Sequence, residues 1–158
     1  HAQLSFEGVS EIPAQYSLIK SFAGLLPDMQ KAMQAGYPEL MEHIQAKDQQ
    51  AVGPPFSVYH KVDLKKMHFV CDMAVPVADD IDTGPFNTRL YDGGRFFKVT
   101  LKGDYQFLEL AWHAAYTHIC SHKIKLDKKR PSLEVYENDP NTVANKNELI
   151  TRLYIPIK

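Results

Sequence analysis

The chain is short of cysteine, of long apolar runs and of net charge, and each shortage excludes a class of protein. Its two cysteines, Cys71 and Cys120, form no CxxC pair and lie in apolar stretches, which predicts two reduced core thiols and favours a cytoplasmic protein. No apolar run is long enough to span a bilayer and no signal peptide opens the sequence, so no membrane partner is expected. The net charge of -1 argues against direct binding of nucleic acid, which needs a basic surface.

The motifs of cofactor and nucleophile chemistry are missing as well. Gly93 and Gly94 form an isolated turn signal, and there is no glycine-rich phosphate loop, nucleophile elbow or Cys/His pair with catalytic spacing. His118 and His122 stand one helical turn apart, a spacing that can chelate zinc, but the sequence offers no third ligand. We therefore expect neither a cofactor nor a metal, and a binding protein more readily than an enzyme.

What the sequence does contain is short strands alternating with two helices. Hydrophobic periodicity and Gly/Pro breaks delimit them, and Pro38 is expected to kink or divide the first helix. The predicted strands are residues 15–22, 56–60, 67–77, 95–102, 132–137 and 149–157, and the helices are residues 27–46 and 107–119.

The two halves of this pattern repeat. Gly24 matches Gly103, Tyr37 matches Tyr116 without a gap, residues 55–59 match 132–136, and residues 73–77 match 153–157. Internal similarity of this kind marks a duplicated unit. The prediction is a single α+β domain over 1–158, made of two pseudo-symmetric β-α-β-β modules at about 6–78 and 94–158 with a linker at about 79–93. Their antiparallel sheet would carry both helices on one face and leave a central ligand groove.

One strand carries unusual chemistry. In the segment 132–140, Leu133, Val135 and Glu137 point to one face, while Glu134 and Tyr136 point to the other. A buried carboxylate without a partner is costly, so this face either lines a pocket or is the solvated side of the sheet. The first module has Ser57 where the second has Glu134. Because the fold requires neither residue, this difference favours a ligand.

The motifs in this order resemble the GyrI-like family, which includes the effector-binding domain of bacterial transcription activators and the DNA gyrase inhibitory protein. The resemblance covers about residues 6–158. It rests on Gly53-Pro54-Pro55-Phe56-Ser57-Val58-Tyr59-His60, on Gly103-Asp104-Tyr105 before the helix with Trp112, on Leu133-Glu134-Val135-Tyr136, and on Thr151-Arg152-Leu153-Tyr154-Ile155-Pro156-Ile157.

The resemblance implies a bacterial, cytoplasmic protein that takes a small, often aromatic or cationic, molecule into its central groove. The family's pocket glutamate falls on Glu134. Aromatic faces would stabilise a cation there, although Trp112 could equally be core and Tyr136 could reach solvent. The predicted ligand contacts are Glu134, Tyr136, Trp112, Tyr105, Phe56 and Tyr91.

Two other functions stay open. As in some relatives, Glu134 could act as a general base and Tyr136 as a proton donor in a hydrolase of reactive electrophiles. The chain could also be an adaptor, like the gyrase modulators, with a protein partner. It contains no helix-turn-helix segment, so we expect a stand-alone binder or the sensor half of a regulator with an upstream DNA-binding domain. The oligomeric state, including a homodimer, stays open.

Overall fold

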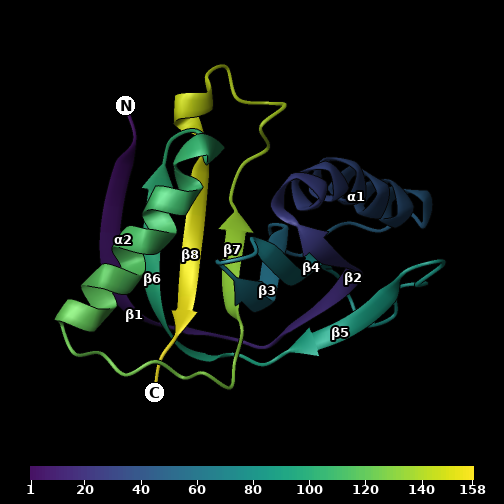
Figure 1. The fold of residues 1–158 in the computed structure, drawn as a ribbon. Coiled ribbons are helices and arrows are strands. Elements are labelled where there is room, and N and C mark those ends of the chain that lie inside the picture. The colour runs from purple at the N-terminus through teal and green to yellow at the C-terminus, as the bar shows by residue number, and fades with distance from the viewer. The chain divides into compact units, whose positions relative to one another are not determined.

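The computed structural model describes residues 1–158 as eight strands and two α-helices, an α+β architecture (Figure 1). The chain forms two compact units, one of Ala14–Asp92 and one of His1–Pro13 with Gly93–Lys158. All strand pairs within each unit are antiparallel. The α+β class and antiparallel sheet predicted from the sequence are therefore confirmed.

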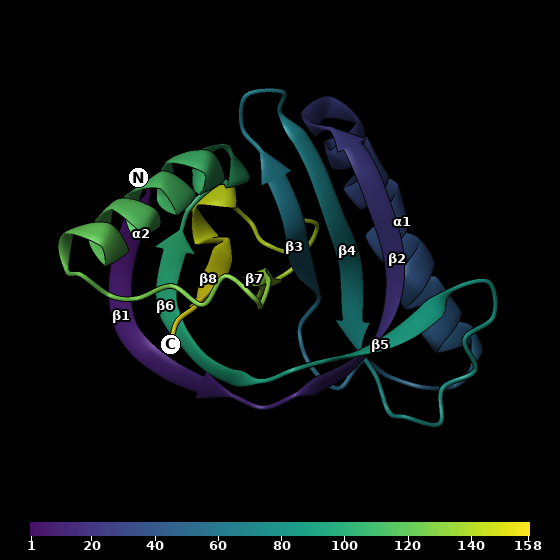
Figure 2. The same ribbon diagram turned by 60° about the horizontal axis from the view of Figure 1, so that its bottom comes forward.

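The unit of Ala14–Asp92 is a four-stranded sheet with one helix on it. Its strand order is β3-β4-β2-β5, and Figure 2 shows β3, β4 and β2 side by side with α1 on one face. The helix can lie close to the sheet at Gly36, where a Cβ atom would come within 2.4 Å of the Met73 sulfur. The elements are β2 (Gln15–Leu25), α1 (Leu26–Ala46), β3 (Phe56–Asp63), β4 (His68–Pro76) and β5 (Asn87–Tyr91).

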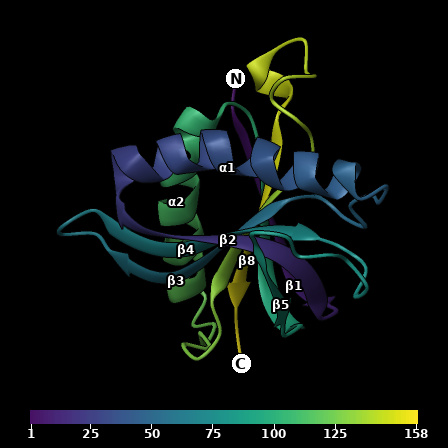
Figure 3. The same cartoon turned by 90° about the vertical axis from the view of Figure 1, so that its right-hand side faces the viewer.

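This sheet has a buried core under α1. Figure 3 shows α1 running along β2 and β4. Leucine, isoleucine and valine side chains fill the space, as expected for a helix whose apolar residues recur at three- and four-residue steps. The fully or nearly fully buried members are Leu18, Leu40, Ile44, Met73, Val75, Val77 and Ile81.

The second unit has the same plan. Its strand order is β1-β6-β8-β7, and α2 covers one face through a core that includes Val99, Ala115 and Leu153. A short 3-10 turn, Tyr105–Phe107, leads into α2, and Asp104 caps it by accepting a hydrogen bond from the Gln106 N–H. The elements are β1 (Gln3–Ile12), β6 (Gly94–Lys102), α2 (Leu108–Ser121), β7 (Ser132–Tyr136) and β8 (Ile150–Pro156), with a second 3-10 turn at Lys146–Glu148.

The sequence repeat is thus a structural repeat with one extra strand in each unit. The order β7-β8-β6-β1 corresponds to β3-β4-β2-β5, so β1 and β5 are equivalent edge strands. Neither was predicted. Most side chains of both strands are exposed, and in β1 a bulge between Phe6 and Gly8 interrupts the alternation begun by Leu4 and Phe6. β1 pairs with β6, so residues 3–12 lie in the unit of the second module, whereas the predicted first module begins at about residue 6.

Other local expectations differ from the structure. Pro38 lies within α1, which continues unbroken from Leu26 to Ala46, so Pro38 does not divide the helix. Cys71 is buried as predicted, but Cys120 is exposed near the end of α2, because it lies outside the buried face formed by Ala111, Ala115 and Ile119. Neither helix combines the length and apolar character needed to cross a membrane.

Candidate functional site

Glu134 is a buried carboxylate on the side of β7 that faces α2. It lies opposite Leu153 of β8 in the register, and Leu153 belongs to the core beneath α2. Only 3% of Glu134 is exposed. The alternative that this face of the strand is solvated is therefore excluded for Glu134 itself.

Two aromatic side chains hold the carboxylate of Glu134. The indole Nε1–H of Trp112 on α2 donates to Oε2 at 2.6 Å, and the phenol of Tyr136, two residues along β7, donates to Oε1 at 2.6 Å. Hydrogen bonds to an ionised acceptor are short and strong, and they offset part of the cost of burying the charge. The ring of Trp112 packs against the core, as the core alternative expected, and its N–H binds the carboxylate; its role as a ligand contact stays a prediction.

Further aromatic rings extend this cluster. Tyr105, at the start of the 3-10 turn before α2, packs edge-on against Tyr136 with ring centroids 5.8 Å apart. Burial, followed by the negative charges of Glu134 and Asp139, raises the pKa of Tyr105 to about 12, so its phenol stays protonated at neutral pH. Tyr116, one turn further along α2, stacks on Trp112 with ring centroids 6.1 Å apart. Glu134, Trp112, Tyr136 and Tyr105 together form the Glu134 cluster.

Thr151 lies beside this cluster and was not predicted. It is the register partner of Tyr136 across β7 and β8, so the two side chains lie on the same face. Thr151 is completely buried, and its hydroxyl has no hydrogen-bond partner. The sequence carries no signal for such a group, because threonine is common in strands and usually finds a partner.

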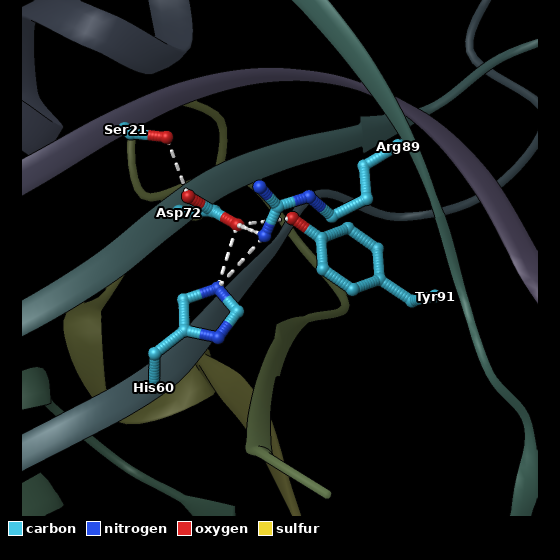
Figure 4. Close-up of polar contacts among 5 residues, drawn as sticks. All are labelled: Ser21, His60, Asp72, Arg89 and Tyr91. Atoms are coloured by element: carbon cyan, nitrogen blue, oxygen red, sulfur yellow. Dashed lines mark hydrogen bonds and ion pairs between the residues drawn. The ribbon is translucent and has the colours of Figure 1, made fainter.

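A second polar cluster occupies the other unit and was also missed (Figure 4). Asp72 on β4 is 2% exposed and accepts hydrogen bonds from Ser21 at 2.6 Å, Tyr91 at 2.5 Å and Arg89 at 3.1 Å. His60 Nε2 lies 2.7 Å from the same carboxylate. Burial raises the pKa of Asp72, but hydrogen bonds from His60, Ser21 and Tyr91 outweigh it and lower the pKa to about 2.

The two remaining predicted ligand contacts lie in this second unit. Phe56 and Tyr91 are both buried and meet edge-on, with ring centroids 5.6 Å apart. The hydroxyl of Tyr91 is bound to Asp72, and burial together with that carboxylate raises its pKa. The structure therefore brings Glu134, Trp112, Tyr136 and Tyr105 together in one unit and Phe56 and Tyr91 together in the other.

No group of three or more histidine, cysteine, aspartate or glutamate side chains is arranged to hold a metal ion. His118 and His122, considered as zinc ligands above, instead stack on each other at 4.0 Å, and His118 also stacks on Phe6 at 4.3 Å.

Comparison with known proteins gives one family and several solved structures. A model described as the GyrI-like small molecule binding domain matches residues 9–158. A search of curated proteins finds no match. The EcmrR C-terminal domain superposes with a TM-score of 0.76 at 17% identity, over 99% of this chain and 98% of that one. In a complex with DNA, EcmrR gives a TM-score of 0.80, also at 17% identity, over 99% of this chain; there this chain spans only 57% of the EcmrR chain.

Two further solved structures are described by a bound ligand or by an activity. SAV2435, solved with bound tetraphenylphosphonium, has a TM-score of 0.67 at 11% identity, over 100% of this chain and 94% of that one. A structure described as a hydrolase from Listeria innocua has a TM-score of 0.61 at 18% identity, over 95% of this chain and 90% of that one. At these identities the likeness establishes a shared fold.

Proposed function

Because this chain belongs to the GyrI-like small-molecule-binding family, we propose that it binds a small aromatic cation at the Glu134 cluster. The observation that carries the proposal is the burial of Glu134 among aromatic donors, with Trp112 and Tyr136 each 2.6 Å from one of its oxygens. The binding of an aromatic cation by SAV2435, which has the same fold, supports it.

The physical reason is that Glu134 brings a charge into the core that the fold does not need. Removing a carboxylate from water costs several kcal/mol, and inside the protein its charge acts more strongly on a nearby cation than it would in water. A cation bound beside Glu134 would be stabilised by this charge, while the faces of Trp112, Tyr136 and Tyr105 would add about 0.5–2 kcal/mol each. Phe56 and Tyr91 stay predictions as ligand contacts.

The test is a titration with tetraphenylphosphonium, followed by the fluorescence of Trp112, the single tryptophan. We expect saturable quenching in the wild-type protein. In Glu134→Gln the affinity should fall at least about tenfold, because the amide keeps the shape but loses the charge.

The matched control is Glu137→Gln. Glu137 follows β7 directly, is exposed, and forms an ion pair with Arg152 at 2.9 Å. The Glu137→Gln substitution therefore removes the same charge from the same segment of the chain, but outside the Glu134 cluster. Its affinity for tetraphenylphosphonium should stay within about twofold of wild type, since exposed charges are screened. Equal losses in both variants, or equal binding of the neutral triphenylphosphine oxide, would contradict a cation site at Glu134.

A second candidate function is hydrolysis of a reactive electrophile. The 2.6 Å contact between the Tyr136 phenol and Glu134 favours it, because a buried carboxylate can activate water and a phenol can protonate a developing oxyanion. The structure described as a hydrolase from Listeria innocua supports it. Turnover of a panel of epoxides and activated cyclopropanes, absent in both Glu134→Gln and Tyr136→Phe, is the expected result. Undiminished turnover in Glu134→Gln would rule out this role.

The likeness to EcmrR suggests the context in which binding would matter. EcmrR is solved in complex with DNA, and this chain corresponds to 57% of that chain. We propose that the domain acts either as the effector-sensing part of a regulator or as a stand-alone binder. Ligand-dependent transcription from a promoter controlled by the full-length protein, abolished by Glu134→Gln, would distinguish the first from the second.

A further inference from the structure

We propose that the hydroxyl of Thr151 is a ligand contact, and that it makes the preferred ligand a cation with an N–H group rather than a fully alkylated one. The inference rests on the proposed function of the Glu134 cluster and specifies its ligand class. Its basis is the buried, unpartnered Thr151 hydroxyl on the face of the sheet that carries Glu134.

The position of Thr151 is fixed by the strand register. It stands opposite Tyr136 of β7 on one side and opposite Leu101 of β6 on the other. Directly opposed residues in an antiparallel sheet have Cβ atoms about 4.5–5.5 Å apart and share a face. Since the phenol of Tyr136 donates to Glu134, Thr151 is adjacent to a residue that touches the carboxylate.

On this face of the sheet, its other neighbours along β8 and across β6 are apolar. The neighbours on the same face, Leu101, Leu149 and Leu153, are all at most 2% exposed. A buried hydroxyl without a partner costs about 1–3 kcal/mol. Valine has nearly the same shape without this penalty, so packing alone does not account for a threonine here.

The structural repeat provides a comparison within the same chain. Aligning residues 73–77 with 153–157 puts Cys71 at the position of Thr151, and each is the register partner of a tyrosine, Tyr59 or Tyr136. Cys71 lies in an apolar cluster with Met29 and Phe69. The fold therefore accepts a weakly polar side chain at this position, as it accepts Ser57 at the position of Glu134. At these two aligned positions the second module has a carboxylate and a hydroxyl, where the first has Ser57 and Cys71; a further unpartnered buried hydroxyl, Ser17, lies in the other unit.

The pair of groups defines a ligand chemistry. Glu134 supplies charge, which any cation satisfies. A hydroxyl accepts a hydrogen bond, and a protonated amine or amidinium has an N–H to donate, whereas a quaternary ammonium or phosphonium has none. A cation that binds beside Glu134 and donates an N–H to Thr151 would gain from the charge of the one and supply the missing partner of the other.

The experiment is a double-mutant-type cycle in which one change is made in the ligand and one in the protein. The probes are (1-naphthylmethyl)dimethylammonium, which is protonated at neutral pH, and its trimethylammonium analogue, which lacks the N–H. Affinities for both are measured by calorimetry in wild type, Thr151→Val and Thr151→Ser. The trimethyl probe controls for charge and for contact with the aromatic rings, and Thr151→Ser controls for loss of the methyl group.

In the wild type and in Thr151→Ser, the N–H probe should bind about fivefold better than the trimethyl probe. In Thr151→Val the two affinities should agree within about twofold, with the trimethyl probe bound as in the wild type. A ratio unchanged by Thr151→Val overturns the inference while leaving the cation site intact. If neither probe binds wild type, or if both bind Glu134→Gln equally well, the proposed function itself fails.

Discussion

At the scale of single residues, the Glu134 cluster shows how a fold can hold a buried carboxylate in a fixed position. Trp112 is placed by α2 and Tyr136 by the same strand as Glu134, so the donors come from two elements that the core already fixes. Their hydrogen bonds orient the carboxylate as well as stabilise it. For the ligand proposed above, such preorganisation would reduce the cost of binding, because little would have to move.

The first prediction concerns the donor on α2. Trp112→Phe keeps an aromatic ring but removes the N–H that binds Glu134, so the free energy of unfolding should fall by about 1–3 kcal/mol. Urea denaturation of both proteins measures this difference in the free energy of unfolding. In the Glu134→Gln background the same substitution should cost less, because a neutral amide makes a weaker bond.

Tyr116→Phe is the control for Trp112→Phe. Tyr116 is 41% exposed and its hydroxyl lies 3.1 Å from Ser132 at the surface, so its loss should change stability by less than about 0.5 kcal/mol. An identical cost of Trp112→Phe with and without the Glu134 charge would assign the effect to packing instead of the hydrogen bond.

The second prediction concerns Thr151 in the absence of ligand. Replacing its unpartnered hydroxyl by a methyl group in Thr151→Val should raise the free energy of unfolding by about 1 kcal/mol. Thr100→Val is the matched comparison in the neighbouring strand β6. The Thr100 hydroxyl lies 2.9 Å from Arg152 and also contacts Glu7, so the same change should destabilise the protein. Thermal unfolding of both variants tests the opposite signs.

At the scale of elements, the two units place comparable polar networks on equivalent strands with the charges reversed. Ser21 of β2 pairs in register with Asp72 of β4, and Thr100 of β6 pairs with Arg152 of β8. The anion Asp72 is bound by Arg89, and the cation Arg152 is bound by Glu137. Each network ties three or more strands together, so each contributes to fixing the register of its own sheet.

The third prediction is the pH dependence contributed by Asp72. Its pKa is about 2 when folded and 3.8 in the reference state, so its ionised form is favoured by folding. The stabilisation is fully present above pH 4 and is lost as the pH falls toward 2; it amounts to on the order of 2 kcal/mol. The stability advantage of wild type over Asp72→Asn, measured by urea denaturation, should therefore shrink across this range.

Asp80→Asn is the control for Asp72→Asn, since Asp80 is exposed in the segment before β5. The free energy of unfolding of Asp80→Asn should differ from that of the wild type by less than about 0.5 kcal/mol, and this difference should not change from pH 7 to pH 2. A constant gap between wild type and Asp72→Asn over the same pH range would mean that the network does not depend on the charge of Asp72.

These elements also show what the sequence could and could not predict. Alternation along residues 132–137 indicated the face shared by Glu134 and Tyr136, and the repeat indicated the β-α-β-β succession of elements along each half of the chain. The network around Asp72 was missed because Ser21, Asp72 and Arg89 come from strands far apart in the chain. Their contact depends on register, which propensity and periodicity do not determine. Thr151 was missed because only the absence of a partner distinguishes it.

At the scale of the whole molecule, the edge strands link the two units through the chain. β1 precedes β2 in sequence but pairs with β6, and β5 precedes β6 but pairs with β2. Each unit therefore receives its outer strand from the segment that leads into the other unit. The first thirteen residues belong to the same unit as the Glu134 cluster, although about eighty residues separate them from β6.

This connectivity gives the last prediction. Deleting residues 1–13 removes β1, its pairing with β6 and the stacking of Phe6 on His118. The exposed edge of β6 should lose hydrogen-exchange protection by at least about tenfold, and the loss should extend to β8, since native-state exchange reports cooperative local units. The amides of β2, which follows the deletion in sequence but lies in the other unit, and of its partner β4 serve as the internal control and should keep their protection. A loss centred on β2 and β4 would instead mean that sequence proximity, and not the pairing of β1 with β6, decides where residues 1–13 contribute stability.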